Sequence, residues 1–161
     1  MKLYHGGTEP VQKPMIIETQ RLLDFGKGFY VTSNQEQANR WAMIKQNRNG
    51  SNAKAIVSVY EFNEILFNQD KYKVKSFETA NEEWLDFIAS NRRDFVNHPY
   101  DIVKGAVAND TLYATLLLYE TGVLSKQETI ARLKVHKLFD QISFHNNSVL
   151  NELKFIESYQ L

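Results

Sequence analysis

The stretch Asp24–Ala42, DFGKGFYVTSNQEQANRWA, sets a turn, a strand and a helix in close succession. The aromatic and β-branched run Gly28–Thr32 predicts a short strand. Ser33 or Asn34 can then cap a helix that runs to about Asn47, because both side chains accept hydrogen bonds from the first free N–H groups of a helix. The stretch therefore indicates a fold that combines strands and helices.

Gly26 and Gly28 flank a lysine in this stretch, and glycine-rich turns often hold phosphate groups. A dinucleotide-binding fingerprint needs a third glycine that opens a helix after a strand, and a phosphate loop needs Gly-Lys-Ser/Thr at that place. Here the turn leads into a strand, so the sequence matches neither motif. A tight turn that sets the start of the strand is the better interpretation.

The composition predicts one globular domain over residues 1–161. A chain of 161 residues with 43% hydrophobic and 12% aromatic residues can bury a substantial core. Lysine plus arginine and aspartate plus glutamate balance at 19 each, so no global field favours nucleic acid or an anionic membrane. No run is apolar over the length of a signal peptide or a membrane span. We therefore expect a cytoplasmic protein without membrane contact.

Metal binding and thiol chemistry are not expected. The chain contains no cysteine, which excludes disulfides, thiolate nucleophiles and cysteine-ligated zinc. The histidines lack the HxxxH spacing of a helical metal site. They stand at His5, His98, His136 and His145.

Strand and helix patterns alternate irregularly along the rest of the chain. The apolar run Ala55–Asn63 is the strongest strand pattern and is predicted to be central in a sheet. The regular spacing of a doubly wound sheet is missing, which favours an α+β fold with mixed or antiparallel sheets. Further strands are predicted at 3–5, 71–78, 101–108, 141–145 and 154–161, and helices at 81–93, 111–122, 125–139 and 146–153.

The spacing of side chains predicts further features of three helices. Ala38, Trp41, Ala42 and Lys45 share one face of the helix that ends near Asn47. Trp84, Leu85 and Ile88 are predicted to point inward from the helix at 81–93. Ser125 and Glu128 are spaced as a capping box at the start of the helix at 125–139.

Four motifs in a fixed order carry a family resemblance: YHGG at 4–7, DFGKGFYVT at 24–32, VAND at 107–110 and DQISFH at 140–145. They resemble the ADP-ribosyltransferase superfamily, in particular its branch of diphtheria toxin and poly-ADP-ribose polymerases. That branch is marked by a His, a Tyr and usually a Glu on three strands. The closest similarity is to a bacterial family of unknown function assigned to this superfamily.

The resemblance spans nearly the whole chain and implies an ADP-ribosyltransferase-like fold. In that fold two small, packed, mostly antiparallel sheets with flanking helices surround a cleft that binds NAD. The implied reaction is the transfer of ADP-ribose from NAD to a macromolecular acceptor with release of nicotinamide, which is a glycosyltransferase reaction. NAD is the expected co-substrate, and no metal is expected.

The resemblance also implies a role for each matching residue. His5 would hydrogen-bond the hydroxyls of the adenine-side ribose, and the backbone of Gly6 would hold the nicotinamide amide. Tyr30 would stack on the nicotinamide ring. Trp41, eleven residues further on, would close the other side of the ring. Stacking on both sides suits a flat cationic ring, with roughly 0.5 to 2 kcal/mol for each aromatic face.

Gln141 departs from the family pattern, because the third position is usually a glutamate. In the glutamate enzymes this side chain binds the ribose hydroxyl next to the bond that breaks, and it favours the positive charge that develops there. Gln141 keeps the hydrogen bond and loses the charge. Slow chemistry, a different acceptor and NAD binding without transfer therefore all remain open. The expected catalytic residues are Gln141, Tyr30 and His5.

Plainer interpretations stand beside these roles. Tyr30 and Trp41 could be core aromatics, His5 an exposed strand-end histidine and Gln141 a polar residue at a strand start. Two rival hypotheses for the whole chain are a catalytically weak NAD-binding or ADP-ribose-sensing module and a structural α+β protein without a nucleotide site.

The acceptor side and the biological role rest on the resemblance alone. Asn109 and Asp110 could end a strand and cap the next helix, or they could line the acceptor side of the site. The acceptor could be a protein or a nucleic acid. The resemblance suggests a bacterial toxin of a toxin–antitoxin or phage-defence pair, held in check by a small antitoxin protein.

Overall fold

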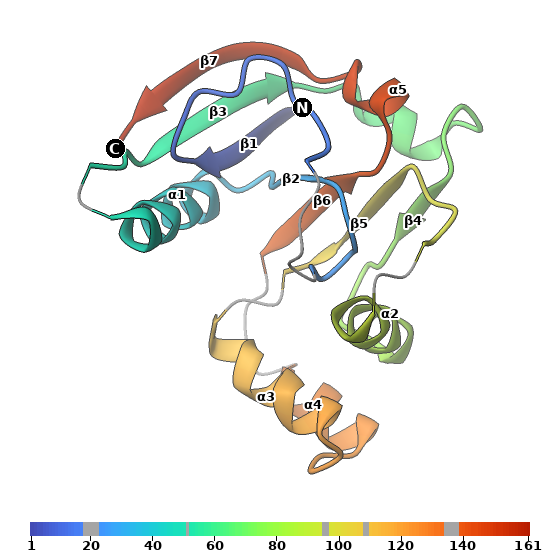
Figure 1. Cartoon of the computed structure of the whole chain (residues 1–161). Coiled ribbons are helices and arrows are strands. Elements are labelled where there is room, and N and C mark those ends of the chain that lie inside the picture. The colour runs from blue at the N-terminus through green and yellow to red at the C-terminus, as the bar shows by residue number, and fades with distance from the viewer. Residues whose placement is uncertain (18–22, 51, 95–96, 108–109, 134–138) are drawn as a thin grey trace.

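The computed structural model of the chain describes residues 1–17, 23–50, 52–94, 97–107, 110–133 and 139–161. Within these ranges the chain forms two sheets, one of three strands and one of four, with helices packed around them (Figure 1). All strand pairs but one are antiparallel. The prediction of an α+β fold is confirmed. No helix in the described ranges is long and apolar enough to span a membrane.

The first sheet has the order β1-β3-β7 and consists of β1 (Lys2–Gly7), β3 (Ile56–Glu61) and β7 (Lys154–Gln160). The central position of β3 is confirmed, and five of its six residues are buried. The predicted strand at the end of the chain is confirmed as β7, which lies at an edge of the sheet and is mostly exposed.

The second sheet has the order β2-β6-β5-β4. β2 (Phe29–Val31), β6 (Asp140–Phe144) and β5 (Ile102–Ala106) pair antiparallel, whereas β4 (Val74–Ser76) pairs parallel to β5. A parallel pair needs a crossover connection, and here helix α2 (Glu82–Arg93) supplies it. The predicted strands at these places are confirmed. β2, β4 and β5 are shorter than predicted, and β6 begins and ends one residue earlier than predicted.

Helix α1 (Gln35–Asn49) begins where the sequence predicted, because the Asn34 side chain accepts a hydrogen bond from Gln37 N at 2.8 Å. Ala38 and Ala42 are fully buried. These small side chains allow the helix to lie close to β1, and α1 packs mainly on that strand. The helix face predicted from the spacing is thus buried at both alanines, whereas Trp41 is half-buried and Lys45 is exposed.

The remaining helices cover the far face of the second sheet or link its strands. In α2 the side chains of Trp84, Leu85 and Ile88 are fully buried, as predicted. α3 (Asp110–Glu120) and α4 (Lys126–Leu133) form a hairpin. The predicted continuation of α4 over 134–138 falls outside the described residues.

Three local features complete the helices. The predicted capping box at the start of α4 is confirmed, since Ser125 and Glu128 exchange hydrogen bonds. α5 (Asn147–Leu150) matches the predicted helical turn after β6, and the short 3-10 helix η1 (Glu64–Asn68) was not predicted.

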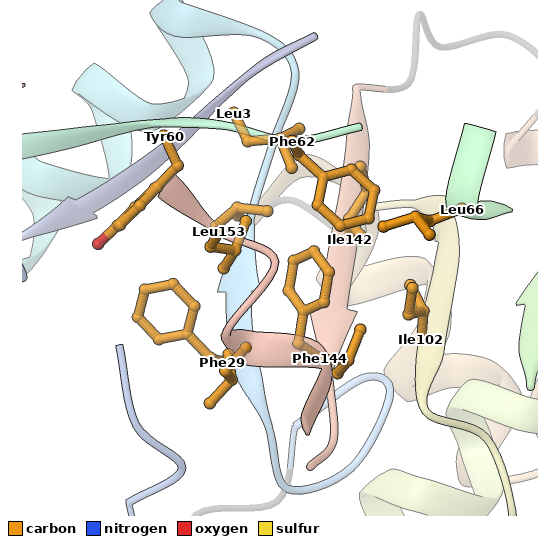
Figure 2. Close-up of a cluster of buried hydrophobic side chains, with 12 residues drawn as sticks. Leu3, Phe29, Tyr60, Phe62, Leu66, Ile102, Ile142, Phe144 and Leu153 are labelled. Carbon is orange, nitrogen blue, oxygen red and sulfur yellow. The ribbon is translucent and has the colours of Figure 1, made fainter. Parts of the chain in front are cut away.

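The main core lies between the two sheets. Edge-to-face ring pairs join them, with centroids 5.9 Å apart for Phe29 and Tyr60 and 5.4 Å apart for Phe62 and Phe144. Such pairs contribute about 0.5 to 1.5 kcal/mol beyond the burial of their area. Figure 2 shows the cluster, which includes Leu3, Phe29, Tyr60, Phe62, Leu66, Ile102, Ile142, Phe144 and Leu153.

A second core lies on the opposite face of the second sheet, against α2, α3 and α4. Side chains along a strand alternate between the two faces. Phe29 and Val31 accordingly belong to the first core, and Tyr30 packs against the second. On β6, Ile142 belongs to the first core. This alternation decides which side chains can contribute to a site.

Candidate functional site

Three neighbouring strands carry the predicted catalytic residues: His5 lies on β1, Tyr30 on β2 and Gln141 on β6. β1 and β2 belong to different sheets but meet at one bridge. In this bridge Tyr4 N donates to Thr32 O at 2.9 Å, and Thr32 N donates to Tyr4 O at 3.0 Å. β2 contacts both of the other strands: it meets β1 at this bridge and pairs with β6 in the second sheet (Figure 1). Segments far apart in the sequence thus converge here.

His5 is held in a defined orientation and protonation state. Its Nδ1 lies 2.7 Å from the Tyr30 carbonyl oxygen, and its ring stacks on Phe29 with centroids 4.5 Å apart. Burial, and secondly the positive charge of Lys45, lower the pKa of His5 from 6.5 to about 3. The imidazole is therefore neutral. Because a carbonyl oxygen can only accept, the single proton lies on Nδ1, and Nε2 is a bare acceptor that suits a hydroxyl group.

Gly6 forms the close contact between β1 and α1. A Cβ atom at this position would lie 2.3 Å from Ala38 O and 2.9 Å from the Cβ of Trp41. Only glycine therefore allows the end of β1 to lie against the helix that carries Trp41. The structure places the predicted Gly6 and Trp41 next to each other.

Lys45 is a further residue at this end of β1. Its Nζ donates to the Gly6 carbonyl oxygen at 2.6 Å. The sequence predicted Lys45 only as a member of the helix face that includes Trp41, and it assigned no role at the site. The available signal was its spacing, since Lys45 follows Trp41 by one helical turn.

The Tyr30 hydroxyl closes the turn that precedes its own strand. It donates to Gly26 O at 2.6 Å and accepts from Phe25 N at 3.0 Å. The ring also stacks on Phe25, with centroids 6.5 Å apart. Burial, and secondly the charge of Asp24, raise the pKa of the Tyr30 phenol, which stays protonated. Within the described part of the chain, the rings of Tyr30 and Trp41 make no contact with each other.

Gln141 is almost fully buried, with 4% of its surface exposed. Its Nε2 donates to Asp24 Oδ2 at 3.1 Å, and Asp24 Oδ1 in turn lies 3.0 Å from Arg92 Nε. Asp24 and Arg92 are contacts that the sequence did not predict. Asp24 stands at the start of the DFGKGFYVT motif, which was the only available signal.

The turn before β2 thus binds two of the predicted catalytic residues. Asp24 holds the Gln141 side chain, and Phe25 and Gly26 hold the Tyr30 hydroxyl. The turn itself is tight: a Cβ atom on Gly28 would lie 2.8 Å from Phe144 O. The predicted tight turn before the strand is confirmed, and its contacts fix the Tyr30 hydroxyl.

The predicted acceptor-side residues are not placed with the others. Asn109 lies outside the described residues, and Asp110 begins helix α3.

Two hollows border this region. One, of about 490 Å³, is lined by Lys27, His98 and His145 among others. The other, of about 1100 Å³, includes Gly105, which pairs with Gln141 across β5 and β6. None of His5, Tyr30, Trp41 and Gln141 lines either hollow.

The comparisons with known proteins give one match. A family model described as "Protein of unknown function (DUF3990)" matches residues 1–155. Neither the curated proteins nor the solved structures contain a match to this chain.

Proposed function

We propose that this chain, which belongs to the DUF3990 family, is an NAD-dependent ADP-ribosyltransferase that transfers ADP-ribose to a macromolecular acceptor. The observation that supports this most is the convergence of His5, Tyr30 and Gln141 from three strands of two sheets. A His, a Tyr and a third polar residue on three strands is the arrangement of the superfamily that the sequence resembles. In this proposal the two packed sheets form a single ADP-ribosyltransferase-like domain over residues 1–161.

His5 and Gly6 bind the two ends of NAD in this proposal. The bare Nε2 of His5 accepts a hydrogen bond from a hydroxyl of the adenine-side ribose. The Gly6 carbonyl oxygen accepts from Lys45 and has a second lone pair, which the nicotinamide amide can use. Lys45 therefore contributes by holding the Gly6 backbone in place.

Tyr30 and Trp41 hold the nicotinamide ring between them in this proposal. Two aromatic faces attract a flat cationic ring by stacking and by cation–π interaction. The proposal requires that their rings are not packed on each other, and they make no such contact in the described part of the chain. Gly6 brings the Trp41 backbone to the end of β1, where the nicotinamide would bind.

The chemical step breaks the bond between the ribose C1′ and the nicotinamide nitrogen. Nicotinamide leaves with the electron pair, the ribose develops oxocarbenium character, and a nucleophilic atom of the acceptor bonds to C1′ and loses its proton. Gln141 accepts a hydrogen bond from the adjacent ribose hydroxyl. Holding the ring, excluding water and placing acceptors near the developing positive charge are the contributions of the protein.

The biological setting is part of the proposal. We expect a cytoplasmic bacterial toxin of a toxin–antitoxin or phage-defence pair, whose acceptor is a protein or a nucleic acid. A small antitoxin protein would prevent the binding of NAD or of the acceptor.

A second function is favoured by one observation at the same site. The Gln141 amide replaces a carboxylate and already donates one hydrogen bond inside the protein. A catalytically weak module that binds NAD or ADP-ribose would show this arrangement as well.

Incubation of the purified protein with NAD and cell extract separates the two functions. The enzyme should release free nicotinamide and add the mass of ADP-ribose to one class of acceptor, which mass spectrometry would identify. Release of neither product, together with measurable NAD binding, would support the binding module and contradict the transferase. Arg93→Ala, a change at an exposed position on α2, serves as the control variant and should be as active as the wild type.

A further inference from the structure

Asp24 and Gln141 are joined side chain to side chain across 117 residues of sequence. The carboxylate is almost buried, with 13% of the side chain exposed, and it contacts Gln141 through one oxygen and Arg92 through the other. The three side chains come from separate elements: Asp24 lies in a turn, Gln141 in a strand and Arg92 at the end of a helix. Their common effect is to fix the position of the Gln141 amide.

The Asp24 carboxylate also determines which way the amide is turned. A carboxylate can only accept hydrogen bonds, so the group that faces it must be the NH2 of Gln141. The carbonyl oxygen Oε1, at the other end of the planar amide, then points away from the Asp24 carboxylate. No described residue donates a hydrogen bond to Oε1, although Gln141 itself is almost buried. An acceptor oxygen is thus held in a fixed direction and remains available.

The negative charge lies one hydrogen bond behind this oxygen. Asp24 Oδ1 pairs with Arg92, and Arg92 Nη1 lies 3.8 Å from Glu120 Oε1, so the cluster contains two acids and one base. The charge of Asp24 also acts on the Tyr30 phenol, which the neighbouring residues of the same turn bind.

We propose that Asp24 is a positioning residue for Gln141: it turns the amide oxygen toward the ribose hydroxyl and holds behind it the negative charge that Gln141 lacks. This inference rests on the proposed transferase function. In this proposal the turn before β2 does more than start the strand, because it supplies the Asp24 carboxylate that orients the Gln141 amide. A glutamine at 141 is then the correct partner for an aspartate at 24.

Gln141→Glu alone should therefore impair the site. It would place two carboxylates about 3 Å apart, where like charges raise the pKa of one of them and push the side chains away from each other. The double change Asp24→Asn with Gln141→Glu exchanges the two groups: the amide then stands at 24 and the carboxylate at 141. The hydrogen bond between them is preserved in this exchange.

The first test is nicotinamide release with cell extract as the source of acceptor, for the wild type, Asp24→Asn, Gln141→Glu and the double variant. We expect each single change to lower kcat by roughly 100-fold, with little change in the KM for NAD, because one preorganised contact is lost. The double variant should recover at least tenfold over either single variant. Glu120→Gln, which changes the same cluster without contact to Gln141, should keep wild-type kcat. Losses that simply add in the double variant would overturn the proposal.

The second test does not depend on turnover. The side-chain NH2 signals of Gln141 in a 15N NMR spectrum report its hydrogen bond to Asp24. We expect them to shift and to exchange faster with water in Asp24→Asn, and to stay unchanged in Glu120→Gln. If the wild type releases no nicotinamide, the transferase function fails, and these signals still decide whether Asp24 positions the amide. Identical signals in Asp24→Asn and the wild type would overturn the proposal that Asp24 positions the Gln141 amide.

Discussion

His5 Nδ1 donates a hydrogen bond to the backbone carbonyl oxygen of Tyr30 at 2.7 Å, and this bond joins β1 of the first sheet to β2 of the second. The contact fixes the imidazole without using the Tyr30 side chain. It leaves His5 Nε2 as an acceptor next to Gly7, where a Cβ atom would lie 3.5 Å away. The contact between the two sheets therefore fixes the position of this hydrogen-bond acceptor, His5 Nε2, near the end of β1.

Gly6→Ala should destabilise the protein, whereas Gly7→Ala should be tolerated. A methyl group on Gly6 would lie 2.3 Å from a backbone oxygen of α1, but one on Gly7 meets no atom closer than 3.5 Å. We expect a loss of about 1 to 3 kcal/mol or more in the free energy of unfolding for Gly6→Ala. Urea denaturation followed by circular dichroism measures both variants. Equal stability of the two variants would contradict the contact between β1 and α1.

The ring and the hydroxyl of Tyr30 should have separable effects. Tyr30→Phe keeps the ring and leaves Phe25 N and Gly26 O without their partner, which should cost about 1 to 3 kcal/mol of stability. Tyr30→Ala removes the ring as well, and we expect it to abolish most NAD cleavage. The exposed Arg93→Ala should have no such effect. If Tyr30→Ala and Arg93→Ala, both folded, cleave NAD equally well, Tyr30 is not at the nicotinamide.

Stability should fall as the pH is lowered from 6.5 toward 5. Burial lowers the pKa of His5 to about 3 and that of His145 to about 4, while the unfolded chain binds these protons near pH 6.5. The unfolded state therefore binds more protons, and the free energy of unfolding decreases with falling pH by up to about 1.4 kcal/mol per pH unit for each histidine. The stabilisation is complete above pH 6.5. It is lost as the pH falls toward the folded pKa values.

Denaturation curves at half-unit steps between pH 7 and 5 measure this slope. In this range ordinary carboxyl groups remain largely ionised, so the histidines dominate. His145 bonds Lys27 O through Nδ1 and Ser143 through Nε2, and His145→Gln should reduce the slope by the contribution of one histidine. A flat curve in the wild type would show that these rings are not buried in the neutral form.

Much of the fold follows from local chemistry. The run that forms β3 is apolar on both faces, as a strand in the centre of a sheet must be. Asn34 has a side-chain oxygen that accepts a hydrogen bond from a free N–H group at the start of α1. The inward face of α2 repeats every three to four residues, which gives Trp84, Leu85 and Ile88. These predictions succeeded because each one depends on neighbours within a few residues.

The features that the sequence missed depend on partners far apart in the chain. The parallel pairing of β4 with β5 could not be predicted. The alternation of polar and apolar residues in a strand shows which face is buried, but not which other strand it pairs with. The same is true of the site. The residue types of His5, Tyr30 and Gln141 were visible in the motifs, but the contact of Gln141 with Asp24 arises only when β6 meets the turn before β2.

Isothermal calorimetry with NAD tests the central claim most directly, on the wild type, Trp41→Ala and Met43→Ala. Trp41 and Met43 lie on the same helix, but Met43 is exposed and has no place in the proposed site. The account predicts NAD binding by the wild type and Met43→Ala, and binding about 2- to 30-fold weaker by Trp41→Ala, since one aromatic face contributes roughly 0.5 to 2 kcal/mol. No binding by the wild type at millimolar NAD, or equal binding by all three proteins, would contradict the account.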